Sequence, residues 1–233
     1  MDILLITPPL NVYEHMALDE QIVHLRPQAV TLRFYNWADG PAVTFGYAQF
    51  FKEVQQTLTA QNFSGEYTRR PTGGGVVFHT DDLTFSLVFS SPCERPTEIY
   101  KKLHGFILTQ LTRMGIAAHA LDTKLPASAY APSVNHQASA CFIRPVENDL
   151  LDETGQKMLG GAIRRFGETV LYQGSLQLPG ARNNPALKRA VIDGVREFLA
   201  VDLRPTPACA GRLAAVRQLA ALQYESPSWV EKF

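Results

Sequence analysis

The chain has 233 residues, and its 22 lysine and arginine residues balance 22 aspartate and glutamate residues, so its formal charge is zero. This length suits one compact domain with a hydrophobic core of its own. A neutral chain has no general attraction for nucleic acid or anionic lipid, so composition excludes a function based on binding polyanions.

The N-terminal residues Met-Asp-Ile-Leu-Leu-Ile-Thr-Pro-Pro lack the basic start and long apolar run of a signal peptide. No segment approaches the roughly 20 apolar residues of a membrane span. The three cysteines are Cys93, Cys141 and Cys209, and an odd, sparse count argues against a disulfide framework. We therefore expect a cytoplasmic protein that is not embedded in a membrane.

The first elements follow from periodicity. Apolar residues at helical spacing predict a helix over residues 14–25, which ends before Pro27. Alternating apolar and polar residues predict a strand over 29–37, and a second short strand follows at 42–46. Residues 52–61 are predicted to form another helix.

The most conspicuous loop is Pro-Thr-Gly-Gly-Gly at residues 71–75. Two strands, 76–79 and 83–89, are predicted to follow it as a hairpin. An amphipathic pattern predicts a helix over 97–115. Residues 122–140 have no period, and a surface loop of this length is often functional.

Strands return at 150–151, 157–166 and 169–178, and helices are predicted at 184–199 and 209–222. Helices and strands interleave without a regular strand-helix-strand rhythm. This pattern favours an α+β fold with a mixed sheet rather than a doubly wound one. We expect one catalytic domain over residues 1–203 and a short helical extension over 204–233.

The glycine loop is the first candidate site. Three glycines let a backbone approach a ligand closely, and Arg69 and Arg70 supply positive charge beside them. This combination suits a phosphate, a carboxylate or the thioester end of an acyl group. It is not a phosphate-binding P-loop, because no Gly-Lys-Ser/Thr follows. A flexible hairpin loop with solvated arginines is the simpler interpretation.

The longer string Arg-Arg-Pro-Thr-Gly-Gly-Gly-Val-Val-Phe-His at residues 69–79 closely resembles the signature of the lipoate–protein ligase and octanoyl transferase family. Further similar blocks occur in the same order at residues 15–20, 32–37, 43–49, 82–86, 155–165 and 173–176. The resemblance covers roughly residues 13–199. It implies a mainly antiparallel sheet flanked by helices, with the acyl chain in a tunnel beside the glycine loop. The substrate-binding residues that it implies are Arg69, Arg70, Gly73, Gly74, Gly75, His79, Gly160 and Ala162.

Lys157 occupies the position of the lysine of this family, in the pattern Lys-x-x-Gly-x-Ala. There a positive donor holds the acyl carboxylate or stabilises an oxyanion. The small residues Gly160 and Ala162 leave room for a ligand. Without the resemblance, Lys157 would be an ordinary surface lysine after a turn.

Cys141 decides the mechanism. It ends the unpatterned loop, and the pair Cys141-Phe142 resembles the cysteine-dependent octanoyl transferases of the family. A loop cysteine near basic groups can form the reactive thiolate, and His136 is close enough in sequence to act as its base. An inert, half-buried cysteine is the alternative. Cys93 and Cys209 have no such context and are interpreted as structural.

Two mechanisms remain open. A transferase takes octanoyl from acyl carrier protein through a Cys141 thioester and gives it to a lysine of the lipoyl domains of 2-oxoacid dehydrogenases or glycine cleavage proteins, without a cofactor. A ligase activates lipoate with ATP and Mg²⁺. Gly75 suits the ligase, whereas the roughly 34 residues after Leu199 are too few for the accessory domain of single-chain ligases.

Other functions are less well supported. A biotin–protein ligase would need a Gly-Arg-Gly-Arg loop, which is absent from the sequence. A relative that binds lipoyl domains without catalysis is the remaining alternative. No cysteine and histidine cluster has zinc spacing, so no metal site is predicted.

Overall fold

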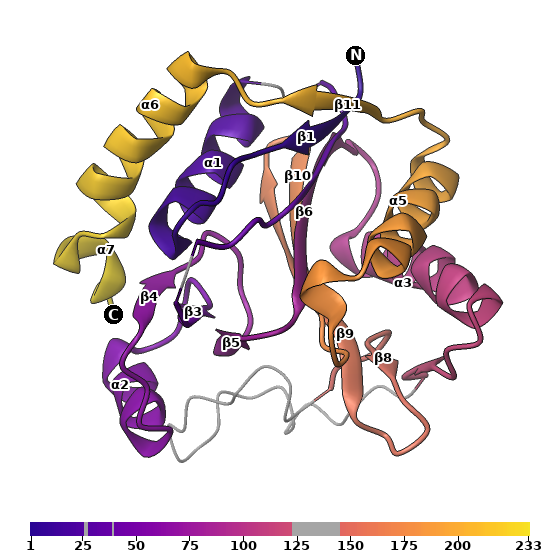
Figure 1. The fold of residues 1–233 in the computed structure, drawn as a ribbon, viewed down its shortest axis with the longest axis horizontal. Coiled ribbons are helices and arrows are strands. Elements are labelled where there is room, and N and C mark those ends of the chain that lie inside the picture. The colour runs from indigo at the N-terminus through magenta and orange to yellow at the C-terminus, as the bar shows by residue number, and fades with distance from the viewer. Residues whose placement is uncertain (26–27, 39, 123–144) are drawn as a thin grey trace.

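The computed structural model describes residues 1–25, 28–38, 40–122 and 145–233, in which an eight-stranded sheet runs through the molecule (Figure 1). Its strands lie in the order β11 (Arg204–Pro207), β1 (Ile3–Ile6), β2 (Thr31–Phe34), β6 (Leu83–Ser90), β10 (Thr169–Leu176), β9 (Lys157–Phe166), β8 (Leu150–Leu151) and β7 (His119–Ala120). Strands β11, β1 and β2 run parallel, and every other neighbouring pair is antiparallel. The predicted α+β fold with a mixed, mainly antiparallel sheet is confirmed.

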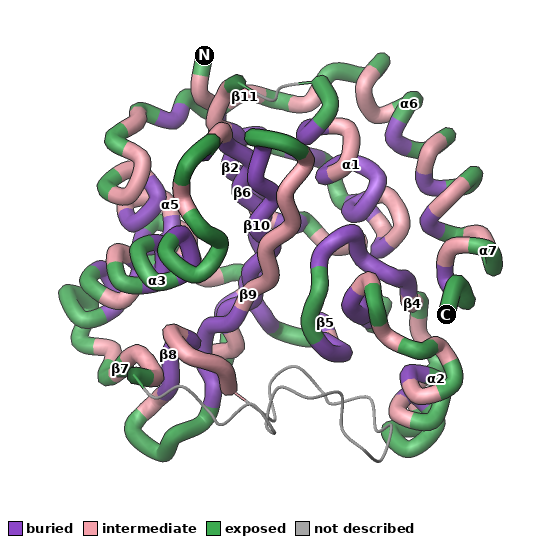
Figure 2. Tube along the Cα trace, turned by 180° about the vertical axis from the view of Figure 1, so that it is seen from behind, coloured by how far each residue is buried: buried purple, intermediate pink, exposed green. Residues whose placement is uncertain are grey.

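Helices cover both faces of this sheet. On one face, α3 (Pro96–Arg113) and α5 (Pro185–Leu199) pack against each other over the larger hydrophobic core. On the other face lies α1 (Val12–Leu25), which is covered in turn by α6 (Ala210–Leu219) and a π-helix (Ala220–Tyr224). Figure 2 shows β2, β6 and β10 buried between these layers.

Strand β6 explains why one face of the sheet can carry a site. Its alternate residues Phe85, Leu87 and Phe89 enter the core under α3 and α5. The alternating residues Thr84, Ser86 and Val88 face the other side, toward α1, and the first two of these carry hydroxyl groups. The face beside α1 is therefore buried but partly polar, because side chains alternate across a strand.

A second, three-stranded sheet lies beside α1. It contains β4 (Glu66–Arg69), β3 (Ala42–Phe45) and β5 (Val77–His79) in that order, and α2 (Phe51–Ala60) packs on it. The glycine loop connects β4 to β5 of this sheet, and Thr72 in it bonds Gln173 of β10, so the loop lies at the boundary between the two sheets.

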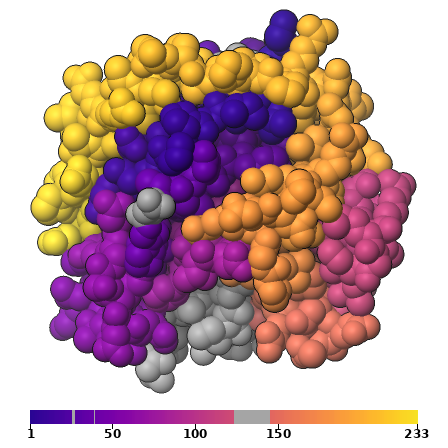
Figure 3. Space-filling model, viewed as in Figure 1, coloured from indigo at the N-terminus to yellow at the C-terminus, as the bar shows by residue number. Residues whose placement is uncertain are grey.

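Residues 204–233 add a strand to the large sheet and pack against the small one. Strand β11 is the edge strand beside β1, and α7 (Pro227–Val230) contacts the small sheet. The yellow C-terminal segment in Figure 3 lies against the indigo and purple parts of the chain. The segment predicted as a short helical extension thus contributes a strand as well as helices.

The predicted helices and strands over residues 14–25, 42–46, 52–61, 83–89 and 157–166 agree with the observed elements to within a few residues. The predicted hairpin of 76–79 with 83–89 is wrong, because β5 pairs with β3 in the small sheet whereas β6 pairs with β2 and β10 in the large one. Strands β1, β4, β7 and β11 were not predicted. Within the described ranges, no helix is long and apolar enough to cross a membrane.

Candidate functional site

A pocket lies between the two sheets, next to α1. The space between its walls is about 400 Å³, a volume that includes open solvent. Its lining residues are Met16, Tyr35, Thr44, Arg70, Val77, His79, Thr84, Gly160, Gly161, Ala162, Gln173, Gly174 and Ser175. Four of the predicted binding residues, Arg70, His79, Gly160 and Ala162, therefore meet in one place.

One wall of the pocket comes from the paired strands β9 and β10. Gly160 lies opposite Ser175, and Ala162 lies opposite Gln173. Because residues two apart share a face of a strand, the two small residues of β9 leave space in front of the two polar residues of β10. Sequence reasoning missed Gln173 and Ser175, although their spacing on a predicted strand placed them on one face.

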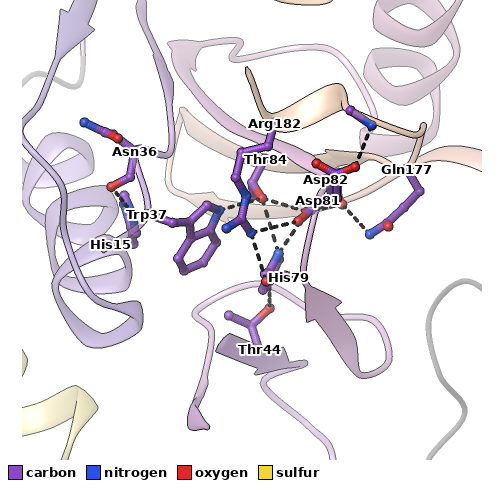
Figure 4. Close-up of polar contacts among 12 residues, drawn as sticks. His15, Asn36, Trp37, Thr44, His79, Asp81, Asp82, Thr84, Gln177 and Arg182 are labelled. Atoms are coloured by element: carbon purple, nitrogen blue, oxygen red, sulfur yellow. Dashed lines mark hydrogen bonds and ion pairs between the residues drawn. The ribbon is translucent and has the colours of Figure 1, made fainter. Parts of the chain in front are cut away.

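His79 is held from both sides of its ring (Figure 4). Its Nε2 lies 2.9 Å from Thr44 Oγ1, and its Nδ1 lies 2.9 Å from Asp82 Oδ2. Trp37 stacks on the ring, with the centroids 4.7 Å apart. The imidazole is thereby fixed in position, and only a small part of it is left to face the pocket.

Asp82 is fully buried and collects hydroxyl donors. Its Oδ2 accepts hydrogen bonds from Thr84 Oγ1 at 2.7 Å and from Ser175 Oγ at 2.6 Å. Burial alone raises the pKa of this carboxyl group, but the charge of His79 and the hydrogen bonds outweigh burial and lower the pKa to about 2. Asp82 is therefore ionised near neutral pH and orients His79.

The glycine loop is fastened to the pocket by Arg70 and Thr72. The Nη2 and Nε of Arg70 donate to the carbonyl oxygen of Gly73 at 2.6 and 3.0 Å, and Thr72 Oγ1 donates to Gln173 Oε1 at 2.6 Å. Gly74 has φ 92°, a left-handed conformation that favours glycine. Gly73 and Gly74 are exposed and Gly75 is buried, and none of the three lines the pocket.

Arg69, in contrast, lies away from the pocket. Its guanidinium is buried and donates to the carbonyl oxygens of Tyr47, Gln49, Trp229 and Val230 at 2.6 to 3.0 Å. The structure therefore does not bring Arg69 to the predicted substrate site. Arg69 instead bonds the C-terminal segment to the small sheet and the loop beside it.

The end of the Lys157 side chain lies next to Gly160, which lines the pocket. A Cβ atom added to Gly160 would lie 2.0 Å from Lys157 Cε and 2.4 Å from Nζ. The ammonium pairs with Asp149, with Nζ 2.8 Å from Oδ2, and both side chains are almost fully buried. The glycine thus provides the space in which the lysine folds back toward the pocket.

Cys141 and His136 lie outside the described residues. Cys93 and Cys209 are both exposed, so the structural role expected for them is not a role in the core. In the parts of the chain that the structure describes, no three histidine, cysteine, aspartate or glutamate side chains could hold one metal ion. A buried cation beside a partly apolar pocket suits an acyl group whose carbonyl oxygen lies near that cation.

Comparison with known proteins agrees with this geometry. Residues 11–191 match the family model of the lipoyl protein ligase A/B catalytic domain. The octanoyltransferase LipM of Halalkalibacterium halodurans is 28% identical over 92% of this chain and 93% of its own length. The LipM of Kyrpidia tusciae is 34% identical over 70% of this chain and 61% of its own length. The solved structure of protein Ta0514 from T. acidophilum with bound lipoic acid has a TM-score of 0.76 at 20% identity, and the match covers 100% of this chain and 98% of that one.

Proposed function

Because this chain belongs to the lipoyl protein ligase A/B catalytic domain family, we propose that it transfers an eight-carbon acyl group, octanoyl or lipoyl, to a lysine of lipoyl-domain proteins. The curated relatives with similar sequences are named octanoyltransferases. The donor in this proposal is octanoyl-acyl carrier protein, and the acceptors are lipoyl domains of 2-oxoacid dehydrogenases or glycine cleavage proteins.

The observation that carries the proposal is the position of the Lys157 ammonium next to Gly160, which lines the pocket. The Cys141 thiolate attacks the donor thioester carbonyl, and the charge that develops on the carbonyl oxygen is stabilised by Lys157 and by backbone N–H groups near the glycine loop. The carrier thiolate leaves. The amine of the acceptor lysine then attacks the new thioester, loses a proton and displaces the Cys141 thiolate.

The other roles follow the lining of the pocket. Met16, Val77 and Ala162 offer apolar contacts to the acyl chain. Arg70 holds the Gly73 carbonyl, and His79 supports the wall beside Thr44. A thioester is already activated, so this route needs neither ATP nor a metal ion.

The test is mass spectrometry of the intact protein after incubation with octanoyl-acyl carrier protein. The variant Cys93→Ser/Cys209→Ser leaves Cys141 as the single thiol of the chain. We expect it to gain the mass of one octanoyl group and to lose that mass when a lipoyl domain is added. Cys141→Ala should gain nothing and should fold normally.

An ATP-dependent lipoate–protein ligase is the second candidate, because a third glycine at Gly75 suits that class. It predicts full activity in Cys141→Ala and a requirement for ATP and Mg²⁺. Lys157→Ala should disable either enzyme by at least about 10²-fold, the effect expected for removing an oxyanion donor. Wild-type rates in that variant would contradict both catalytic assignments. Undetectable acyl transfer by the wild-type protein, with lipoyl-domain binding intact, would instead favour a non-catalytic binding protein.

A further inference from the structure

A second buried polar cluster lies beside the pocket without lining it. It consists of Lys157, Asp149 and Tyr100, which come from β9, from the turn before β8 and from α3. Asp149 is fully buried, and Tyr100 is largely buried. Burying a carboxylate and a phenol is costly unless their hydrogen bonds are made, so the arrangement needs a reason.

Asp149 is fixed by more than the lysine. Its Oδ1 accepts a hydrogen bond from the Tyr100 hydroxyl, and its Oδ2 accepts one from the Val146 N–H at 2.6 Å. The Asp149 N–H in turn donates to the Val146 carbonyl at 2.9 Å. Both carboxylate oxygens therefore have donors, and the Asp149 side chain cannot rotate without breaking several hydrogen bonds.

Tyr100 connects this turn to the strand that lines the pocket. Its hydroxyl oxygen accepts a hydrogen bond from the Gly161 N–H at 2.9 Å. Gly161 and its neighbour Gly160 both line the pocket. One phenol thus sets the distance between β9 and the carboxylate that binds the Lys157 ammonium.

From this geometry we propose that Asp149, held by Tyr100, is a positioning residue for acyl transfer: it provides the counter-charge that keeps the Lys157 ammonium next to Gly160, a residue that lines the pocket. The inference rests on the proposed function. A lysine chain without this partner has four rotatable bonds and would lose the fixed geometry that oxyanion stabilisation requires.

The experiment measures kcat and KM for octanoyl-acyl carrier protein with a lipoyl domain as acceptor. The variants are Asp149→Asn, Lys157→Ala, both together, and Tyr100→Phe. We expect Asp149→Asn to lower kcat by about 10²-fold with little change in KM, because a displacement of about 1 Å in a catalytic group can cost this much. Tyr100→Phe should lower kcat by about tenfold, since it removes one hydrogen bond to the carboxylate.

The double variant separates positioning from a general loss of structure. If Asp149 acts through Lys157, then Asp149→Asn causes no further loss of kcat in the Lys157→Ala background. Tyr172→Phe is the matched control. It also removes a tyrosine hydroxyl from the core, but this hydroxyl bonds His104 and not Asp149. It should keep nearly wild-type kcat.

Thermal unfolding of each variant shows whether it folds. If Asp149→Asn does not fold, the kcat of Tyr100→Phe tests whether Asp149 positions Lys157. Wild-type kcat in the folded Asp149→Asn variant, or in Tyr100→Phe when only that one folds, would overturn this inference alone. Multiplicative losses in the double variant would do the same. A wild-type protein that transfers no acyl group would overturn the proposed function together with the inference.

Discussion

Replacing Gly160 by alanine tests whether the position of Lys157 matters. The added Cβ would lie 2.0 Å from Lys157 Cε, and ordinary contact begins at 3.4 Å. The end of the lysine must therefore move by about 1.4 Å, a displacement large enough to cost on the order of 10²-fold in rate. The fold should tolerate the change, because the atoms that must move belong to the far end of a flexible side chain.

The neighbouring residue provides the matched control. A Cβ added to Gly161 would lie 2.5 Å from the Cζ and hydroxyl oxygen of Tyr172, which is buried in the core under α3. Overpacking of this kind costs about 1 to 3 kcal/mol of stability. Gly160→Ala should thus lose activity with little change in melting temperature, whereas Gly161→Ala should lower the melting temperature.

The assay is the steady-state rate of octanoyl transfer, together with thermal unfolding. Gly160 also lines the pocket, so a methyl group there could act by excluding the acyl chain instead of by moving the lysine. A six-carbon donor distinguishes the two causes, because a shorter chain would restore the rate only if the pocket had become too small. Wild-type kcat in a stable Gly160→Ala protein would refute the role given to the lysine position.

Three further predictions concern stability and the thiols. Burial lowers the pKa of His104 to about 3, so between about pH 6.5 and 3 the unfolded chain binds a proton that the folded chain does not. The free energy of unfolding should therefore decrease by up to about 5 kcal/mol as the pH falls through this range. In His104→Gln, the melting temperature should decrease less in acid than it does in the wild-type protein. Arg69→Lys should lower the free energy of unfolding in urea by about 2 to 4 kcal/mol, because a lysine cannot bond all the carbonyl oxygens that Arg69 does. Arg189 is exposed, so Arg189→Lys, as the control, should change this free energy hardly at all. Cys93→Ser/Cys209→Ser should keep the wild-type transfer rate, since both thiols are exposed; a slower rate would assign one of them to the site.

The sequence predicts the strands that form the pocket better than it predicts the edges of the sheet. Long alternating segments such as 157–166 carry enough residues to show their period. Strand β11 contains Pro205 and Pro207, which argue against a strand, yet prolines are compatible with the edge position that β11 occupies.

The lining of the pocket was predicted in part, for a related reason. Arg69 and Arg70 are consecutive at the end of a strand, so they point to opposite sides, and only one of them can reach the pocket. That alternation was readable in the sequence once β4 was known. The pairing of Asp149 with Lys157, in contrast, depends on the turn and on the irregular pairing of β8 with β9, which no local pattern specifies.

The buried guanidinium of Arg69 also constrains the order in which the molecule can be completed. It joins the loop at residues 46–49 to Trp229 and Val230, which lie 160 and 161 residues after Arg69 in the chain. Contacts over such separations form late, because the intervening chain must be ordered first. During synthesis, the small sheet and the glycine loop beside it therefore remain without these hydrogen bonds until residues 229–230 have emerged from the ribosome.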